Sequence, residues 1–162
     1  MRVPIEAETS PPTTVLGDWY ATLVHTQPRQ LVVCMNERTL LVVLVPAREI
    51  NSLGVRFREA VTAQLQRIGV PSGAIEIEAR AMSDVAFGST ASRSVLGCLR
   101  EAVFSLSLEL DHPRFSSFAG IEDYFGEYIY STTKYRHPCV LARELFEAVS
   151  RGSHSDSLAR IH

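Results

Sequence analysis

Two apolar runs in the first third of the chain constrain its fold most strongly. Residues 31–35 (L-V-V-C-M) and 40–45 (L-L-V-V-L-V) lack the apolar–polar alternation of a strand that has one face in water. Their richness in valine favours strands over helices. We therefore predict two strands that are buried on both faces, with helices over one face and a second subunit over the other.

A third β-prone run precedes these two strands, and short breaks separate all three. The predicted strands are residues 19–26, 30–35 and 39–45. Pro28 suits the second position of a type I turn, and Asn36-Glu37-Arg38 makes the next connection. The sequence therefore predicts an α+β fold, in which three to four helices pack on an antiparallel meander of three or more strands.

Apolar residues at helical spacing predict the helices that pack on this sheet. They are residues 53–68, 74–81, 92–110 and 138–150. Gly69 is placed to end the first helix. A strand is an alternative for the second, because Ile75 and Ile77 alternate with acidic residues. Pro138 opens the last helix, whose inward residues are expected to be Val140, Leu141, Leu145 and Val149.

Two features of the second half of the chain add detail to this fold. Gly97 lies inside the third predicted helix, where glycine costs about 1 kcal/mol relative to alanine. We therefore expect another element to cross that helix closely at Gly97. Residues 126–131 have the composition of a further strand.

The length of 162 residues suits one domain. Three prolines among polar residues mark residues 1–14 as a flexible N-terminal arm, and residues 152–162 read as a disordered tail. The single domain is then residues 15–151. The sequence has no basic-then-apolar leader and no apolar run near the ~20 residues that span a bilayer, so we expect a cytoplasmic protein.

Composition and spacing favour binding over catalysis. The formal net charge of −2 argues against a protein that holds nucleic acid mainly by neutralising phosphates. The three cysteines are far apart without a C-x-x-C pair, and no histidine motif for a metal occurs, so we predict no metal and no cofactor. No G-x-S-x-G elbow marks a hydrolase.

A polar turn before the third predicted helix is the first candidate site. Its hydroxyls and one guanidinium come where a helix exposes unpaired N–H groups, which suits a phosphate or carboxylate ligand. The candidate anion-binding residues are Thr90, Ser92, Arg93 and Ser94. The alternative is plain capping, with Arg93 paired to an acid such as Asp84 or Asp18.

An aromatic-rich segment before the last helix is the second candidate site. Acidic residues are interleaved with its aromatic rings, which suits protein recognition better than stacking on bases. The candidate interface residues are Tyr124, Phe125, Tyr128 and Tyr130. The alternative is a loop that folds over the core.

Asp18, Trp19 and Tyr20 open the first strand and form, with Gly97, the candidate structural motif. A single tryptophan beside a tyrosine can stack on a ligand. More often it closes the end of a core while its indole N–H bonds a carbonyl.

Three segments together resemble an uncharacterised bacterial family of domains of unknown function. They are L-G-D-W-Y-A-T-L at residues 16–23, N-E-R-T-L at 36–40 and T-A-S-R-S-V-L-G at 90–97. Members of that family carry D/E-W-Y-A-x-L, N/S-x-x-T-L and K-T-x-N/S-R-S-V-L-G-S-M-N-D. The similarity covers residues 17–103. It implies a single α/β domain in a bacterial cytoplasm and points to no particular activity.

Two departures from the family pattern bear on function. Ser89 stands where the family has lysine, and Leu99-Arg100-Glu101 stands where it has Met-Asn-Asp. A ligand held by that lysine and asparagine would have lost its site in this chain. Because the sequence has no catalytic spacing but has an acidic, aromatic-rich segment, we expect a non-catalytic protein-binding module, either an antitoxin-like neutraliser of a toxin or an accessory factor of a mobile element, with a homodimer as a further possibility. The alternative is a nucleotide- or RNA-binding protein, or a nuclease, that uses the turn at residues 89–94.

Overall fold

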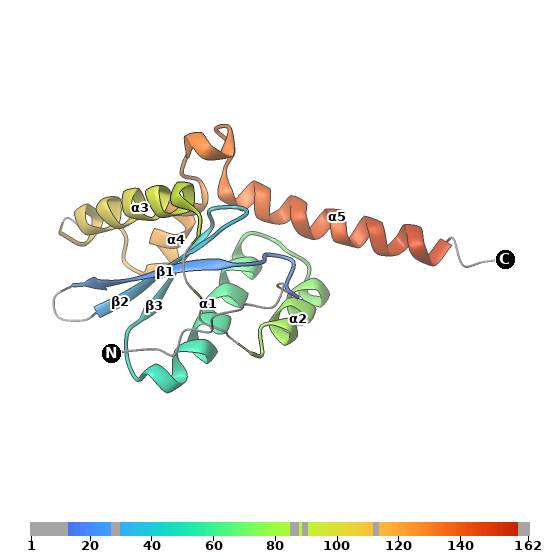
Figure 1. The fold of residues 1–162 in the computed structure, drawn as a ribbon, viewed down its shortest axis with the longest axis horizontal. Coiled ribbons are helices and arrows are strands. Elements are labelled where there is room, and N and C mark those ends of the chain that lie inside the picture. The colour runs from blue at the N-terminus through green and yellow to red at the C-terminus, as the bar shows by residue number, and fades with distance from the viewer. Residues whose placement is uncertain (1–12, 27–29, 85–87, 89–90, 112–113, 159–162) are drawn as a thin grey trace.

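The three predicted strands form one antiparallel sheet in the order β1-β2-β3. They are β1 (Trp19–His25), β2 (Gln30–Asn36) and β3 (Val42–Pro46). The computed structural model describes residues 13–26, 30–84, 88, 91–111 and 114–158 (Figure 1). The predicted meander is confirmed, although β3 begins later than expected, because Thr39 and Leu40 belong to the tight turn that follows Asn36.

The middle strand is buried on both faces, as its unbroken apolar run predicts. Val33 and Met35 of β2 belong to a core on one face, whereas Val32 and Cys34 belong to a second core on the other. β3 divides in the same way, since successive side chains of a strand point to opposite faces. The three-stranded sheet therefore lies between two hydrophobic cores, one on each face.

Helices of the same chain cover both faces of the sheet. They are α1 (Leu53–Arg67), α2 (Ser72–Ala81), α3 (Arg93–Asp111), α4 (Phe118–Gly126) and α5 (Pro138–Leu158). α3 and α4 lie on one side of the sheet, α1 and α2 lie on the other, and α5 projects away from the sheet (Figure 1). The expectation that a second subunit covers one face is therefore wrong, and the buried strands give no reason for a dimer.

The helix boundaries confirm most of the helical predictions. Gly69 ends α1 with a φ of +87°, a conformation that glycine adopts without strain. Residues 72–81 form a helix and not the alternative strand. A short 3₁₀ turn, Ile50–Ser52, precedes α1.

The segment between α3 and α5 differs from the prediction. Residues 126–131 are not a strand: α4 ends at Gly126, and a 3₁₀ turn follows at Ser131–Thr133. Ile121 and Phe125 are buried four residues apart, which is the helical period. Ser117 caps α4 by accepting a hydrogen bond from the Gly120 N–H (3.2 Å).

The last helix packs on a stripe that overlaps the predicted one only in part. Pro138, Ala142 and Phe146 are buried and Leu145 is partly buried against the core, whereas Val149 is exposed. α5 continues to Leu158, into the segment where the sequence predicts a disordered tail. Most of the predicted N-terminal arm, residues 1–12, lies outside the described residues.

Gly97 is exposed, and no element crosses α3 there. A Cβ built on it would meet no atom within 4 Å among those that the structure describes. The expected close crossing is therefore wrong, and this glycine only weakens its helix.

We expect Gly97→Ala to raise the free energy of unfolding by about 0.5–1 kcal/mol, because alanine restricts the unfolded chain and fits the helix. Gly69→Ala is the matched control, since its Cβ would also meet empty space but its φ is +87°. That control should lose about 1 kcal/mol. Urea unfolding of both variants measures these changes, and a destabilised Gly97→Ala would contradict the assignment of open space.

Candidate functional site

The turn before α3 is a helix cap. Ser92 Oγ accepts a hydrogen bond from the Val95 N–H (3.4 Å). The Tyr20 hydroxyl oxygen accepts from the Ser92 N–H (2.9 Å) and the Ala91 N–H (3.4 Å). Two N–H groups that an anion would use are thus already bound to a side chain from β1, which favours the capping alternative.

The other candidate residues of this turn are either exposed or outside the described part of the chain. Arg93 and Ser94 are exposed, and Thr90 lies outside the described residues. Within the part of the chain that the structure describes, Arg93 forms no ion pair, so neither Asp84 nor Asp18 is its partner. An anion site at this turn therefore stays a prediction.

The aromatic-rich segment folds over the core. Phe125 and Tyr130 are fully buried, whereas Tyr124 and Tyr128 are half-buried. The rings pack edge to face and tilted, with Tyr128 and Tyr130 centroids 4.9 Å apart. Burial raises the pKa of the Tyr130 hydroxyl far above its ordinary value. Phe125 and Tyr130 are buried in the core, so of the four candidate interface residues only Tyr124 and Tyr128 present part of their rings at the surface.

Asn36 organises the turn between β2 and β3. Its amide nitrogen donates to the carbonyls of Leu16 (2.9 Å) and Asp18 (3.1 Å). Its amide oxygen accepts from the Thr39 N–H (3.0 Å), the Thr39 hydroxyl (2.9 Å) and the Arg38 N–H (3.1 Å). Asn36 and Thr39 are fully buried, so the N-E-R-T-L segment is a structural junction.

The segment before β1 is fixed by a buried carboxylate. Glu78 of α2 accepts from the backbone N–H groups of Val15 (2.7 Å) and Leu16 (3.0 Å). Gly17 follows with a φ of +72°, and a Cβ there would lie 3.0 Å from Arg38 Nε. Trp19 packs edge to face on Phe57, with ring centroids 5.3 Å apart. Trp19 is therefore partly buried against the core, as the structural alternative expects.

A second polar cluster lies at the outer edge of β3, and we call it the edge cluster: Gln64, Arg67, Glu122 and Asp123. Glu122 accepts from the Leu44 N–H (2.7 Å) and pairs with Arg67. Arg67 also donates to Asp123 (2.9 Å) and to the Gln64 side-chain oxygen. Gln64 Nε2 is buried without a hydrogen-bond partner.

The electrostatics of the edge cluster follow from burial. Burial raises the pKa of Glu122 above its ordinary value, while the Leu44 N–H and the Arg67 guanidinium oppose the shift. Both carboxylate oxygens are engaged, so Glu122 serves the fold and is not a free base. Sequence reasoning missed this role, because Glu122 was grouped with the acids of the aromatic segment. The signal for its burial was its position beside Ile121 on an apolar helix.

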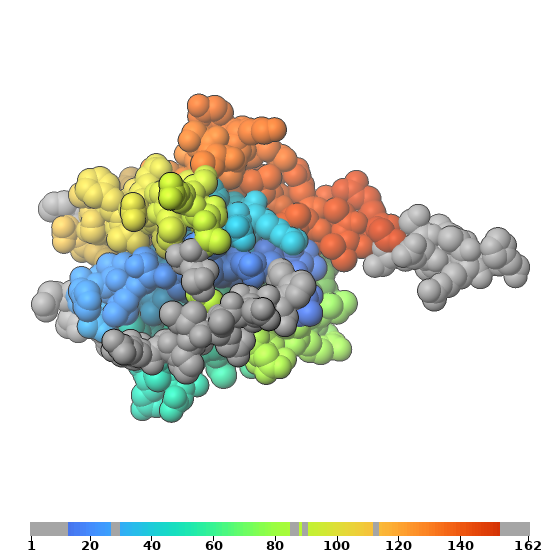
Figure 2. Space-filling model, viewed as in Figure 1, coloured from blue at the N-terminus to red at the C-terminus, as the bar shows by residue number. Residues whose placement is uncertain are grey.

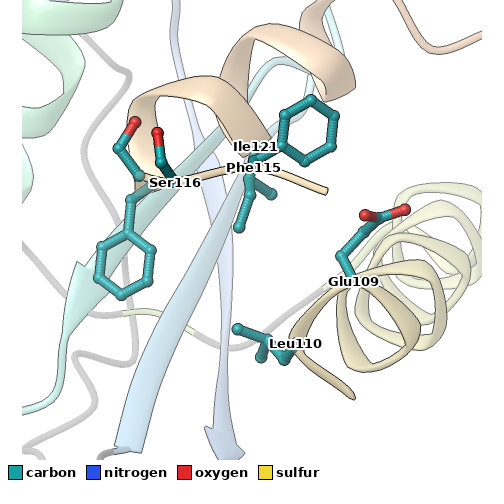
Figure 3. Close-up of a pocket in the computed structure, with 7 residues that line it drawn as sticks. Glu109, Leu110, Phe115, Ser116 and Ile121 are labelled. Carbon is teal, nitrogen blue, oxygen red and sulfur yellow. The ribbon is translucent and has the colours of Figure 1, made fainter. Parts of the chain in front are cut away.

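A shallow pocket of about 330 Å³ lies between the end of α3 and the start of α4 (Figure 3). Its lining residues are Glu109, Leu110, Phe115, Ser116, Ser117, Phe118 and Ile121. Glu109 pairs with Arg114, which lowers the pKa of the Glu109 carboxyl. The pocket therefore offers apolar contacts and two serine hydroxyls, without a free acid or base.

The outer face of α3 exposes two large apolar side chains one helical turn apart. Phe104 is 66% exposed and Leu108 is 51% exposed. Figure 2 shows α3, in yellow, as an outer surface of the molecule. The sequence alone does not mark Phe104 and Leu108 as exposed, because apolar residues four apart on a helix usually face the core.

Two of the three free cysteines are buried, and Cys139 is partly exposed. The buried ones are Cys34 and Cys98, and burial, aided by the charge of Glu122, raises the pKa of the Cys34 thiol to about 12.

Among the described residues, no three His, Cys, Asp or Glu side chains gather to hold a metal ion. No helix in the described part of the chain combines the length and the apolar character that crossing a membrane requires.

Comparison with known proteins identifies a family but no curated relative. A protein-family model described as Domain of unknown function (DUF6933) matches residues 1–141. This confirms the resemblance to an uncharacterised family of domains of unknown function. The search of curated proteins found no match.

Proposed function

The chain belongs to the family described as Domain of unknown function (DUF6933), and from the surface of its own fold we propose that it acts as a non-catalytic protein-binding module. The outer face of α3 carries this proposal. α3 buries Leu99, Ala102 and Leu106 in the core, while Phe104 and Leu108 point away from it. Covering a side chain of this size contributes roughly 1.5–3 kcal/mol.

The pocket at the end of α3 supports the same function. Four of its lining residues are apolar: Leu110, Phe115, Phe118 and Ile121. An apolar side chain of a partner can fill this pocket, as anchors in well-packed interfaces do.

The state of the buried acids supports a binding role over a catalytic one. Glu78, Glu109 and Glu122 are the buried carboxylates of the described residues, and each engages both oxygens with N–H donors. None is thus left as a free base or nucleophile. That the partner is a toxin, which this chain neutralises by contact, stays a prediction.

The nucleotide- or RNA-binding alternative has less support. Its site at residues 89–94 would use backbone N–H groups around the start of α3, and the Tyr20 hydroxyl accepts from the two that directly precede the helix, those of Ala91 and Ser92. Arg93 is exposed, so no buried surroundings strengthen its attraction for an anion.

We expect the double variant Phe104→Ser/Leu108→Ser to lose its partner. Tagged full-length chain is purified from its native cell, co-purifying proteins are identified by mass spectrometry, and the partner is then tested as a purified protein. The dissociation constant should rise at least about tenfold, since each truncated anchor costs more than about 1 kcal/mol.

The matched control is Val55→Ser/Ile77→Ser, which alters two exposed apolar residues of α1 and α2 on the other side of the sheet. It should bind like the wild type. A partner that binds the α3 variant and the wild type equally would refute the proposed surface.

A further inference from the structure

The loop between α4 and α5 has a strained backbone that holds an aromatic ring in solvent. Lys134 and Tyr135 have φ values of +52° and +62°, the left-handed region that side chains other than glycine rarely adopt. Each costs roughly 1–2 kcal/mol relative to a relaxed backbone. Tyr135 is nevertheless 73% exposed, so no burial of its ring offsets this cost.

Polar contacts within the loop hold this conformation. Thr133 Oγ1 lies 2.8 Å from the carbonyl oxygen of Tyr130 and 2.8 Å from that of Arg136, and its single proton is donated to one of the two or shared between them. His137 Nδ1 lies 2.7 Å from the Glu127 carbonyl oxygen. The buried ring of Tyr130 anchors the base of the loop in the core.

The loop also lies against α3. Thr132 Oγ1 is 3.2 Å from Cys98 Sγ, and the Tyr128 hydroxyl donates to Glu101 (3.0 Å). The loop protrudes from the body of the molecule above the start of α5 (Figure 1). Its exposed residues therefore extend the side of the molecule on which α3 lies.

Charge gives the loop a preference for a partner. Lys134 is exposed and forms no ion pair with any residue that the structure describes. Arg136 is already paired with Glu144. Exposed Ile129 and Tyr135 add apolar surface beside this free cation.

We propose that residues 129–135 are a preformed recognition loop for a protein partner, in which the Tyr135 ring fills an apolar pocket and Lys134 pairs with a carboxylate at its rim. Strained backbone is frequent at functional sites, and tyrosine is a frequent anchor of interfaces. A preformed loop loses little conformational entropy on binding. The inference rests on the proposed function and names the chemistry of the partner's surface: apolar with an acidic edge.

The test uses Tyr135→Gly, which separates strain from recognition. Glycine relieves the left-handed strain, so the urea midpoint of the full-length chain should rise, whereas the affinity for the co-purified partner should fall at least about tenfold. A residue with only a structural role would not move these two properties in opposite directions. Lys134→Gln should weaken the same complex, and more so at low salt.

Four outcomes decide the inference. Opposite shifts of stability and affinity in Tyr135→Gly support it. Unchanged binding in Tyr135→Gly overturns it, and the proposed function survives if Phe104→Ser/Leu108→Ser still loses the same partner. Loss of the bound material on ribonuclease treatment overturns it in favour of stacking on nucleic acid. Failure of the wild type to retain any protein beyond the level of an unrelated tagged control overturns both.

Discussion

Asn36→Leu is expected to lower the free energy of unfolding by at least about 3 kcal/mol. Leucine has nearly the same shape but makes none of the five hydrogen bonds of the Asn36 amide. Buried groups such as the Leu16 carbonyl and the Thr39 N–H would lose their partner, at a cost of about 1–3 kcal/mol each. Urea unfolding followed by circular dichroism measures the loss.

Asn51→Leu is the matched control, because Asn51 is exposed and lies in the short 3₁₀ turn before α1, away from the buried junction. It should change stability by less than about 0.5 kcal/mol. Asn36→Asp adds a finer test: it keeps the acceptor for Thr39 but cannot donate to the carbonyls of Leu16 and Asp18. A stable Asn36→Leu protein would show that this junction does not fix the start of β1.

Arg67→Met is expected to cost roughly 3 kcal/mol at neutral pH. It removes the cation from Glu122, whose carboxylate stays buried against the Leu44 N–H. Breaking a buried ion pair leaves one charge without compensation, and this is among the more damaging single changes. Arg80→Met is the control, since Arg80 pairs with Glu76 at 3.7 Å on an exposed helix face and should matter by less than about 1 kcal/mol.

The loss in Arg67→Met should depend on pH. Burial raises the pKa of Glu122 in the folded protein, so protonation stabilises folding. This contribution is fully present below the unfolded pKa of about 4.3 and is lost as the pH rises through the folded pKa. Without Arg67 the folded pKa rises further, so the deficit relative to the wild type should shrink as the pH falls. A deficit that stays constant from neutral to acidic pH would contradict the role of the ion pair.

The fold was largely readable from sequence, because its strands and helices have strong periodic patterns. The valine-rich runs predicted strands buried on both faces, and Gly69 predicted the end of α1. The strand predicted at residues 126–131 was wrong. Tyrosine and isoleucine favour strands in general, but this segment follows a helix that buries Ile121 and Phe125 on one side. The prediction that Val149 is buried was wrong, because apolar spacing does not indicate how far along α5 the core extends.

The candidate sites were harder to predict, because they depend on contacts distant in sequence. The Tyr20 hydroxyl reaches the turn before α3 across more than seventy positions of the chain, so no local pattern reveals that the cap is occupied. Glu122 meets Leu44 over a similar separation. The strain at Lys134 and Tyr135 has no sequence signature, because neither is a residue type that favours the left-handed region.

The bond from Glu122 to the Leu44 N–H has a consequence for solubility. An edge strand with free N–H groups is a template on which other chains can add, and proteins block such edges with charges and prolines. β3 has both devices, since Glu122 occupies its outward N–H and Pro46 ends it. Loss of the carboxylate would thus uncover a valine-rich template, and the damage would be seen as fibrous or amorphous aggregates at concentrations where the native chain stays dispersed.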